Sequence, residues 1–159
     1  MKDILAALEF SRNELVRNNY VLAFKQITEI IIKAMSPGIN DPGTAINGID
    51  YLTELFALRL KKNDNSLISN KNEVYIKVST VKFEDLLYNV MASIRTYCKQ
   101  DIILIQKLLL MLKFLKTQDV KKQSYLVCID TEIKTLLDDV KLSVSNQRDL
   151  DTALKIAKN

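Results

Sequence analysis

One short stretch of this chain holds every glycine and proline that it contains. The three glycines and two prolines all lie between Ser36 and Gly48, in the segment SPGINDPGTAING. Glycine and proline are the residues that let a backbone turn sharply or that stop a helix. A chain that gathers all of them in one place has one special corner, and the rest of it is free to form helices.

Apolar residues repeat at helical spacing through most of the remaining sequence. Asp41, Thr80, Asp101 and Asn146 each stand where an N-cap would begin a helix. The sequence therefore predicts an all-α fold, a single-domain bundle of six or seven helices over residues 1–159, with one short extended segment near residues 74–78. The predicted helices cover about residues 3–17, 20–35, 42–62, 80–99, 102–115 and 119–143, with a short last helix after Asn146 and a polar loop at 63–66.

The composition excludes several classes of protein. Apolar residues make up 48% of the chain, too many for a disordered segment, and the net charge of +4 comes from lysines spread along the sequence. We therefore expect no nucleic-acid partner, since such a surface needs clustered basic residues. The most apolar run, Ile102–Leu115, is too short to span a bilayer and is expected to form a central helix buried on most sides.

The absence of histidine removes the usual general base and the usual zinc ligand. Cys98 and Cys128 are too few for a disulfide framework, and both lie in apolar helical contexts. We expect both to be reduced and buried, as in a cytosolic domain. The sequence assigns no catalytic residue, cofactor or metal ion.

The special corner is predicted to be a rigid connection between two helices. Pro37 disfavours helical geometry at Ser36, and Gly38 is expected to adopt positive φ, so that Gly38→Val would destabilise the fold. Asp41 and Pro42 form an N-cap and N1 pair. The spacing of glycines resembles a phosphate loop, but the lysine is missing and Asp41 already occupies the positive helix end.

Two interpretations of the corner stay open. It is either a tight helical hairpin whose polar groups satisfy its own amides, or a preorganised polar site. Asn47, Asp50 and Glu54 extend it as a polar seam, expected to face solvent or to pair with Arg95. Asp50 with Glu54 could hold only a hard ion such as Mg²⁺ or Ca²⁺. The candidate site residues are Ser36, Pro37, Gly38, Asn40, Asp41, Pro42, Thr44, Asn47, Asp50 and Arg95.

The corner also carries a family resemblance. The run Ala34–Pro42, followed by Thr44-Ala45 and by Ile49-Asp50-Tyr51-Leu52, resembles the hallmark of a bacterial family of predicted membrane proteins, domain of unknown function twenty-two fifty-four. The segment Ile94–Tyr97 is similar to its later arginine-containing helix. The chain departs from the family pattern at several positions, among them Asn18-Asn19, Ala23, Lys25, Gly43 and Tyr51.

The resemblance implies a larger parent protein, with transmembrane helices before this region and this helical part on the cytoplasmic side of the inner membrane. It implies no reaction and no transferable catalytic residue. The leading hypothesis is a domain for self-association or for regulation of the membrane part, with a second copy as partner. The alternatives are a free-standing soluble adaptor or small-ligand-binding protein, and an enzyme that uses a divalent ion held by Asp41, Asp50 or Glu54.

Overall fold

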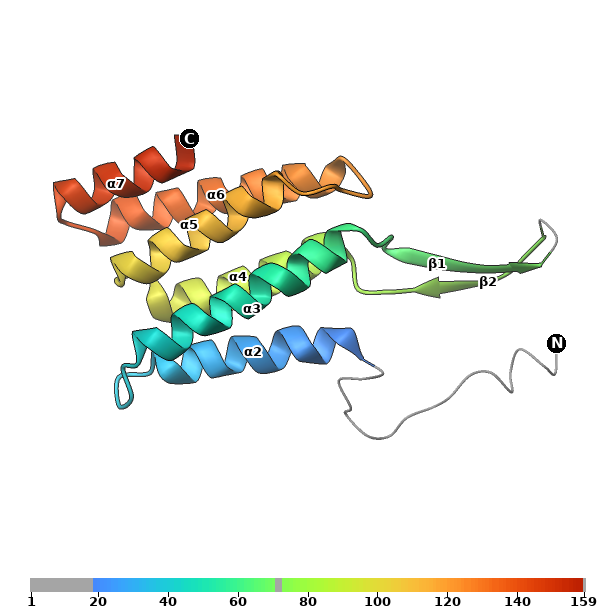
Figure 1. The fold of residues 1–159 in the computed structure, drawn as a ribbon, viewed down its shortest axis with the longest axis horizontal. Coiled ribbons are helices and arrows are strands. Elements are labelled where there is room, and N and C mark those ends of the chain that lie inside the picture. Colours follow the sequence, from blue (N-terminus) through green and yellow to red (C-terminus); the bar gives the residue numbers. More distant parts are fainter. Residues whose placement is uncertain (1–18, 71–72, 159) are drawn as a thin grey trace.

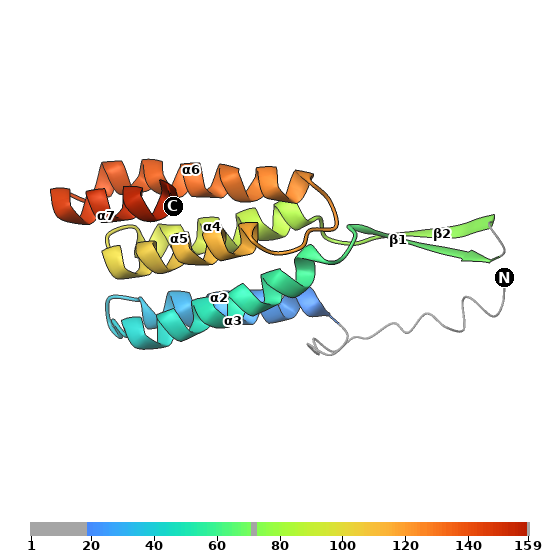
Figure 2. The ribbon, with the colours of Figure 1, turned by 45° about the horizontal axis from the view of Figure 1, so that its top comes forward.

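A computed structural model describes residues 19–70 and 73–158, giving the backbone alone for the two strands. Figure 2 shows its helices in three layers of two, α2 with α3, α4 with α5 and α6 with α7. The predicted helical bundle is therefore confirmed. The helices are α2 (Tyr20–Ala34), α3 (Pro42–Leu60), α4 (Phe83–Cys98), α5 (Ile102–Lys116), α6 (Ser124–Ser143) and α7 (Gln147–Lys158), and the strands are β1 (Asn65–Asn70) and β2 (Glu73–Ser79).

Predicted capping residues begin three of these helices. Asp41 accepts a hydrogen bond from Thr44 N at 3.1 Å, and Asp101 accepts one from Leu104 N at 3.0 Å. Asn146 Oδ1 accepts one from Arg148 N at 3.0 Å. Each cap satisfies an amide that the first helical turn leaves without a partner. The starts of α3, α5 and α7 were therefore predictable from single residues.

A row of aromatic rings forms the core at one end of the bundle. Phe24 of α2 lies 4.6 Å from Phe56 of α3, centroid to centroid, and Phe56 lies 6.0 Å from Phe83 of α4. Phe83 in turn lies 4.6 Å from Tyr125 of α6. All four residues are almost fully buried. Since aromatic side chains bury large apolar areas in these tilted and edge-on geometries, the row holds four helices together.

The strands form an antiparallel hairpin that projects beyond the helices (Figure 1). Asn65 lies opposite Ser79, and the register shifts between Ile68 and Ser69. The extended segment predicted near residues 74–78 is confirmed by β2. The polar loop predicted over 63–66 is wrong in part, because β1 already begins at Asn65.

Two other predicted boundaries are wrong, and tertiary contacts explain both. The predicted sixth helix begins at Ser124 and not near Asp119, since Lys121 N bonds to Leu60 O at 2.8 Å and holds the preceding segment against the end of α3. Thr80 does not cap α4, which begins at Phe83, because its hydroxyl donates to Asp64 O. The helix predicted over residues 3–17 lies outside the described residues.

Candidate functional site

The Ser36–Asp41 corner connects α2 to α3 through hydrogen bonds among its own groups. Ser36 Oγ donates to Lys33 O at 2.7 Å, and Asp41 N donates to Ala34 O at 2.8 Å. Thr44 Oγ1 donates to Asp41 Oδ2 at 2.6 Å, besides the capping bond from its amide. These Thr44 bonds lower the pKa of Asp41. The pattern favours the helical hairpin over the preorganised polar site, and ligand binding at the corner stays a prediction.

The predicted positive φ at Gly38 is wrong. Asn40 takes the left-handed conformation instead, with φ 47°, and an added Cβ at Gly38 would meet no atom within 4 Å. Asparagine is one of the few residues with a side chain that tolerates this region. The destabilisation expected of Gly38→Val therefore does not follow from the structure.

Gly48, by contrast, allows two helices to approach closely. A Cβ at this position in α3 would lie 2.5 Å from Ile31 Cγ1 of α2, much closer than van der Waals contact. A Cβ at Gly43 would lie 3.3 Å from Asp41 Oδ1, which belongs to the cap of the same helix. Of these two glycines, Gly48 alone allows a close approach between two helices. This part of the corner positions α2 against α3.

The polar seam on α3 and the predicted partner Arg95 belong to different parts of the molecule. Asp50 Oδ1 lies 2.5 Å from Lys107 Nζ of α5. Arg95 of α4 contacts α6 instead, with Nη1 2.5 Å from Glu132 Oε2 and Nε 3.1 Å from Asp139 Oδ2. The predicted pairing of Arg95 with the seam is therefore wrong, since α4 packs against α2 and α6 while α3 packs against α2 and α5.

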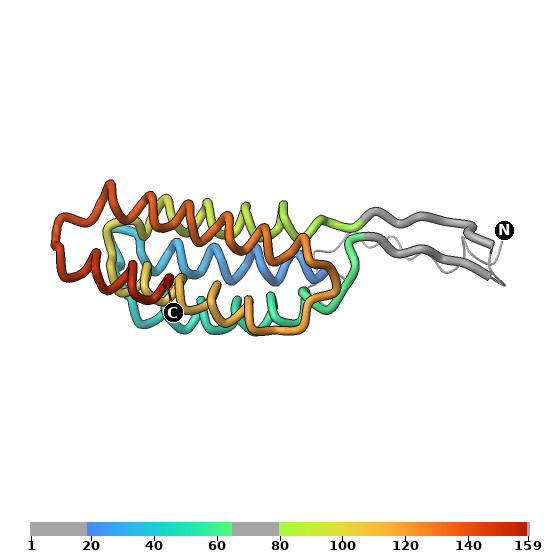
Figure 3. Tube along the Cα trace, turned by 90° about the horizontal axis from the view of Figure 1, so that it is seen from above, coloured from blue at the N-terminus to red at the C-terminus, as the bar shows by residue number. Residues whose placement is uncertain are grey.

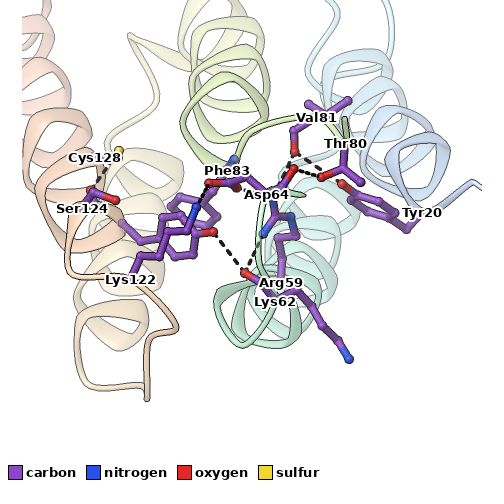
Figure 4. Close-up of polar contacts among 11 residues, drawn as sticks. Tyr20, Arg59, Lys62, Asp64, Thr80, Val81, Phe83, Lys122, Ser124 and Cys128 are labelled. Atoms are coloured by element: carbon purple, nitrogen blue, oxygen red, sulfur yellow. Dashed lines mark hydrogen bonds and ion pairs between the residues drawn. The ribbon is translucent and has the colours of Figure 1, made fainter. Parts of the chain in front are cut away.

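Asp64, which the sequence did not single out, lies at the centre of a polar cluster that we call the Asp64 cluster. It lies between the end of α3 and the hairpin, with 14% of its side chain exposed. Its Oδ1 accepts from Arg59 Nη2 at 2.7 Å and from Phe83 N at 2.9 Å, while Oδ2 lies 2.9 Å from Lys122 Nζ (Figure 4). The Asp64 carboxylate thus accepts a hydrogen bond from the first amide of α4, which is the capping role predicted for Thr80.

Arg59 extends this Asp64 cluster to α2, α4 and α6. Its guanidinium donates to Lys62 O at 3.2 Å and to Val81 O at 3.0 Å. It also lies about 6 Å from the ring centroids of Tyr20, Phe83 and Tyr125. The side chain is only 4% exposed, so the cluster provides nearly all of the environment of this charge.

The cluster keeps its charges fixed near neutral pH. Burial alone would raise the pKa of Asp64, but hydrogen bonds from Lys122, Arg59 and Phe83 N hold it well below its usual range. Burial alone would likewise lower the pKa of Arg59, and the bond to Asp64 reverses that effect. Because neither group changes its protonation near pH 7, neither Asp64 nor Arg59 suits the role of a general acid or base at that pH.

The hypothesis of an enzyme that uses a divalent ion gains no support from the described residues. Within residues 19–70 and 73–158, no group of three histidine, cysteine, aspartate or glutamate residues could hold a metal ion. Asp41 is engaged with Thr44 and Asp50 with Lys107. A divalent-ion enzyme built on Asp41, Asp50 or Glu54 therefore has no assembled site in this part of the chain.

One feature of the sequence points to Arg59. Ile49, Leu52 and Phe56 recur at helical spacing as a buried stripe of α3, and the next position of the same stripe is Arg59. A charged residue on a buried stripe requires a partner of opposite charge. Asp64 and Lys122 are 58 residues apart, so the helical spacing could not show that they meet.

Comparison with known proteins identifies the class to which this bundle belongs. The model of the family described as "Predicted membrane protein (DUF2254)" matches residues 1–114. This match spans most of the chain, from before α2 almost to the end of α5, and the chain belongs to this family. No curated protein and no solved structure matches the chain. Among the helices of the described residues, none has the length and apolar character that a bilayer span requires.

Proposed function

We propose that this chain is a self-associating part of a membrane protein, lying on the cytoplasmic side, where pairing of two copies regulates the membrane part. The observation that carries the proposal is a stripe of exposed apolar side chains on α5. Ile103, Leu110 and Phe114 are 59%, 53% and 47% exposed, although seven of the fifteen residues of their helix are buried. Together with Lys107 they fall on one line along α5, and we call these four residues the α5 stripe.

The α5 stripe borders a groove between α3 and α5, which lie side by side along the bundle (Figure 3). The groove has a volume of about 400 Å³, and Thr53 and Glu54 line it from α3. Met111 lines its floor from α5. A helix laid on the α5 stripe would therefore contact both helices of this face.

The spacing of the α5 stripe suits a second copy related by a two-fold axis. If two α5 helices pack antiparallel, Ile103 of one copy lies opposite Phe114 of its partner, and Lys107 lies opposite Leu110. Each contact then occurs twice, as a two-fold interface requires. The ion pair to Asp50 at 2.5 Å neutralises Lys107, so the lysine brings no unbalanced charge into the pairing.

The size of this face predicts a weak dimer. A helix of 15 residues is about 22 Å long, so the paired surfaces fall at the small end of specific interfaces. Weak pairing becomes effective when a membrane holds the copies close together, because anchoring raises their effective concentration. This supports a role in which association depends on the membrane-bound parent protein.

The two free cysteines support the cytoplasmic side. Cys98 is buried, and burial raises the pKa of its thiol to about 11. Cys128 is half-buried and also free. Unpaired thiols are typical of proteins in the reducing cytoplasm, whereas disulfides persist in oxidising compartments.

Leu110→Glu is expected to abolish self-association. The substitution places a charge in the middle of the α5 stripe, at a position exposed enough that the fold tolerates it. Sedimentation equilibrium over the micromolar range should show the unmodified chain in a concentration-dependent dimer and the variant as a monomer. The matched control is Leu142→Glu, at an 88% exposed leucine of α6, which should associate like the unmodified chain. A Leu110→Glu variant that still dimerises normally would contradict the proposal.

A further inference from the structure

A pocket unrelated to the α5 stripe opens between the start of α2 and the end of α3. It has a volume of about 410 Å³, within the range of small-molecule sites. Tyr20, Phe24, Leu55 and Leu58 give it apolar walls. Arg59 and Lys62 lie among the polar residues that complete the lining. Pockets of this composition accept a ligand with an apolar body and fix it by a few polar contacts.

The charges around this pocket are not balanced. Arg59 and Lys62 line it, and Lys122 lies just behind, on the far oxygen of Asp64. Asp64 is the single carboxylate in this group, and each of its oxygens already accepts from a cation. The pocket therefore lies beside an excess of positive charge that one further carboxylate would reduce.

Arg59 also has an unused hydrogen-bond donor. Among the described residues, its Nε has no hydrogen-bond partner, although the side chain is only 4% exposed. A buried N–H without an acceptor is energetically costly, so such groups are rare unless a water or a ligand satisfies them. The atom is shielded from solvent, so an incoming acceptor must displace a neighbouring side chain, and Lys62 beside it is exposed.

We infer that this pocket binds a small amphipathic carboxylate, with its apolar body between Tyr20 and Leu58 and its head group at Arg59 and Lys62. A carboxylate suits this end of the pocket because its two oxygens can accept charge-assisted hydrogen bonds from Arg59 Nε and from the Lys62 ammonium. A single negative charge suits the site better than a dianion, because the Asp64 carboxylate lies behind the same guanidinium. The inference does not rest on self-association, since the pocket lies on the side of α3 that faces α2.

Titration calorimetry with octanoate, octanol and acetate tests this inference on the full chain. Octanoate should bind one per chain and about ten- to a hundredfold more tightly than octanol or acetate, because only octanoate supplies both the apolar body and the charge-assisted hydrogen bonds. Octanol binding as tightly as octanoate would overturn the inference, since it would reveal apolar partitioning alone. The absence of octanoate binding would overturn it as well.

Two neighbouring lysines provide a matched pair of variants. Lys62→Ala should weaken octanoate binding about two- to fivefold, whereas Lys61→Ala should leave it unchanged, since Lys61 is equally exposed but does not line the pocket. Leu55→Trp should block the pocket and abolish binding, with circular dichroism confirming that the helices remain. If neither Lys62→Ala nor Leu55→Trp changed the affinity for octanoate, the site would lie elsewhere and the assignment would be overturned.

Discussion

Asp64→Ala is expected to lower the free energy of unfolding by about 3–5 kcal/mol, measured by urea denaturation at pH 7. The substitution leaves the buried Arg59 guanidinium without its carboxylate and removes the acceptor of Phe83 N at the start of α4. The matched control is Asp130→Ala, which breaks an ion pair to Lys116 at a carboxylate 55% exposed. We expect that control to change stability by less than about 1 kcal/mol. Similar losses in the two variants would show that burial of the Asp64 cluster is unimportant.

The same contacts predict how stability depends on pH. The pKa of Asp64 is lower in the folded chain than in the unfolded chain, so its contribution is fully present above the unfolded pKa of about 3.9. The contribution is lost progressively as the pH falls below that value towards the folded pKa. Denaturation curves for the unmodified chain and Asp64→Ala should therefore keep their separation from pH 7 to about pH 5 and approach one another from about pH 4 to about pH 2. A difference that stays constant with pH would contradict the ionic origin of the stabilisation.

Gly48→Val is expected to destabilise the fold by about 2–3 kcal/mol, which a lower urea midpoint would measure. The new side chain would overlap Ile31, whose Cγ1 lies 2.5 Å from the position of the added Cβ. Gly38→Val is the control, in the same corner but facing open space, and should stay within about 0.5 kcal/mol of the unmodified chain. A larger loss of stability in Gly38→Val than in Gly48→Val would contradict this account, because it would mean that the corner is strained at Gly38, where φ is not positive.

The helices could be predicted from the sequence because burial repeats every three or four residues along them. Phe83, Leu87, Val90 and Ile94 recur at helical spacing along α4, and all four are buried. Single-residue signals were equally informative for Asp41 and Asp101, whose side chains cap the helices that they precede. Interactions of this kind act within one turn of helix, so the local sequence contains them.

Contacts between distant segments could not be predicted in this way. The start of α6 was misplaced because a bond from Lys121 to Leu60 holds the preceding segment, and no local pattern reports it. The Asp64 cluster was missed for the same reason, since its members come from four separate parts of the chain. At the corner the motif was located correctly, but the left-handed residue is Asn40 and not Gly38, because either residue type accepts that conformation.

Cysteine cross-linking tests the proposed antiparallel pairing of α5 most directly. A chain carrying Ile103→Cys and Phe114→Cys, with Cys128→Ser to remove the more exposed native thiol, should form a covalent dimer on mild oxidation. Each single variant should remain a monomer, because equivalent positions of the two copies would lie about 16 Å apart, beyond the reach of a disulfide. A double variant that stays monomeric, or single variants that cross-link as readily, would contradict the proposed self-association through the α5 stripe.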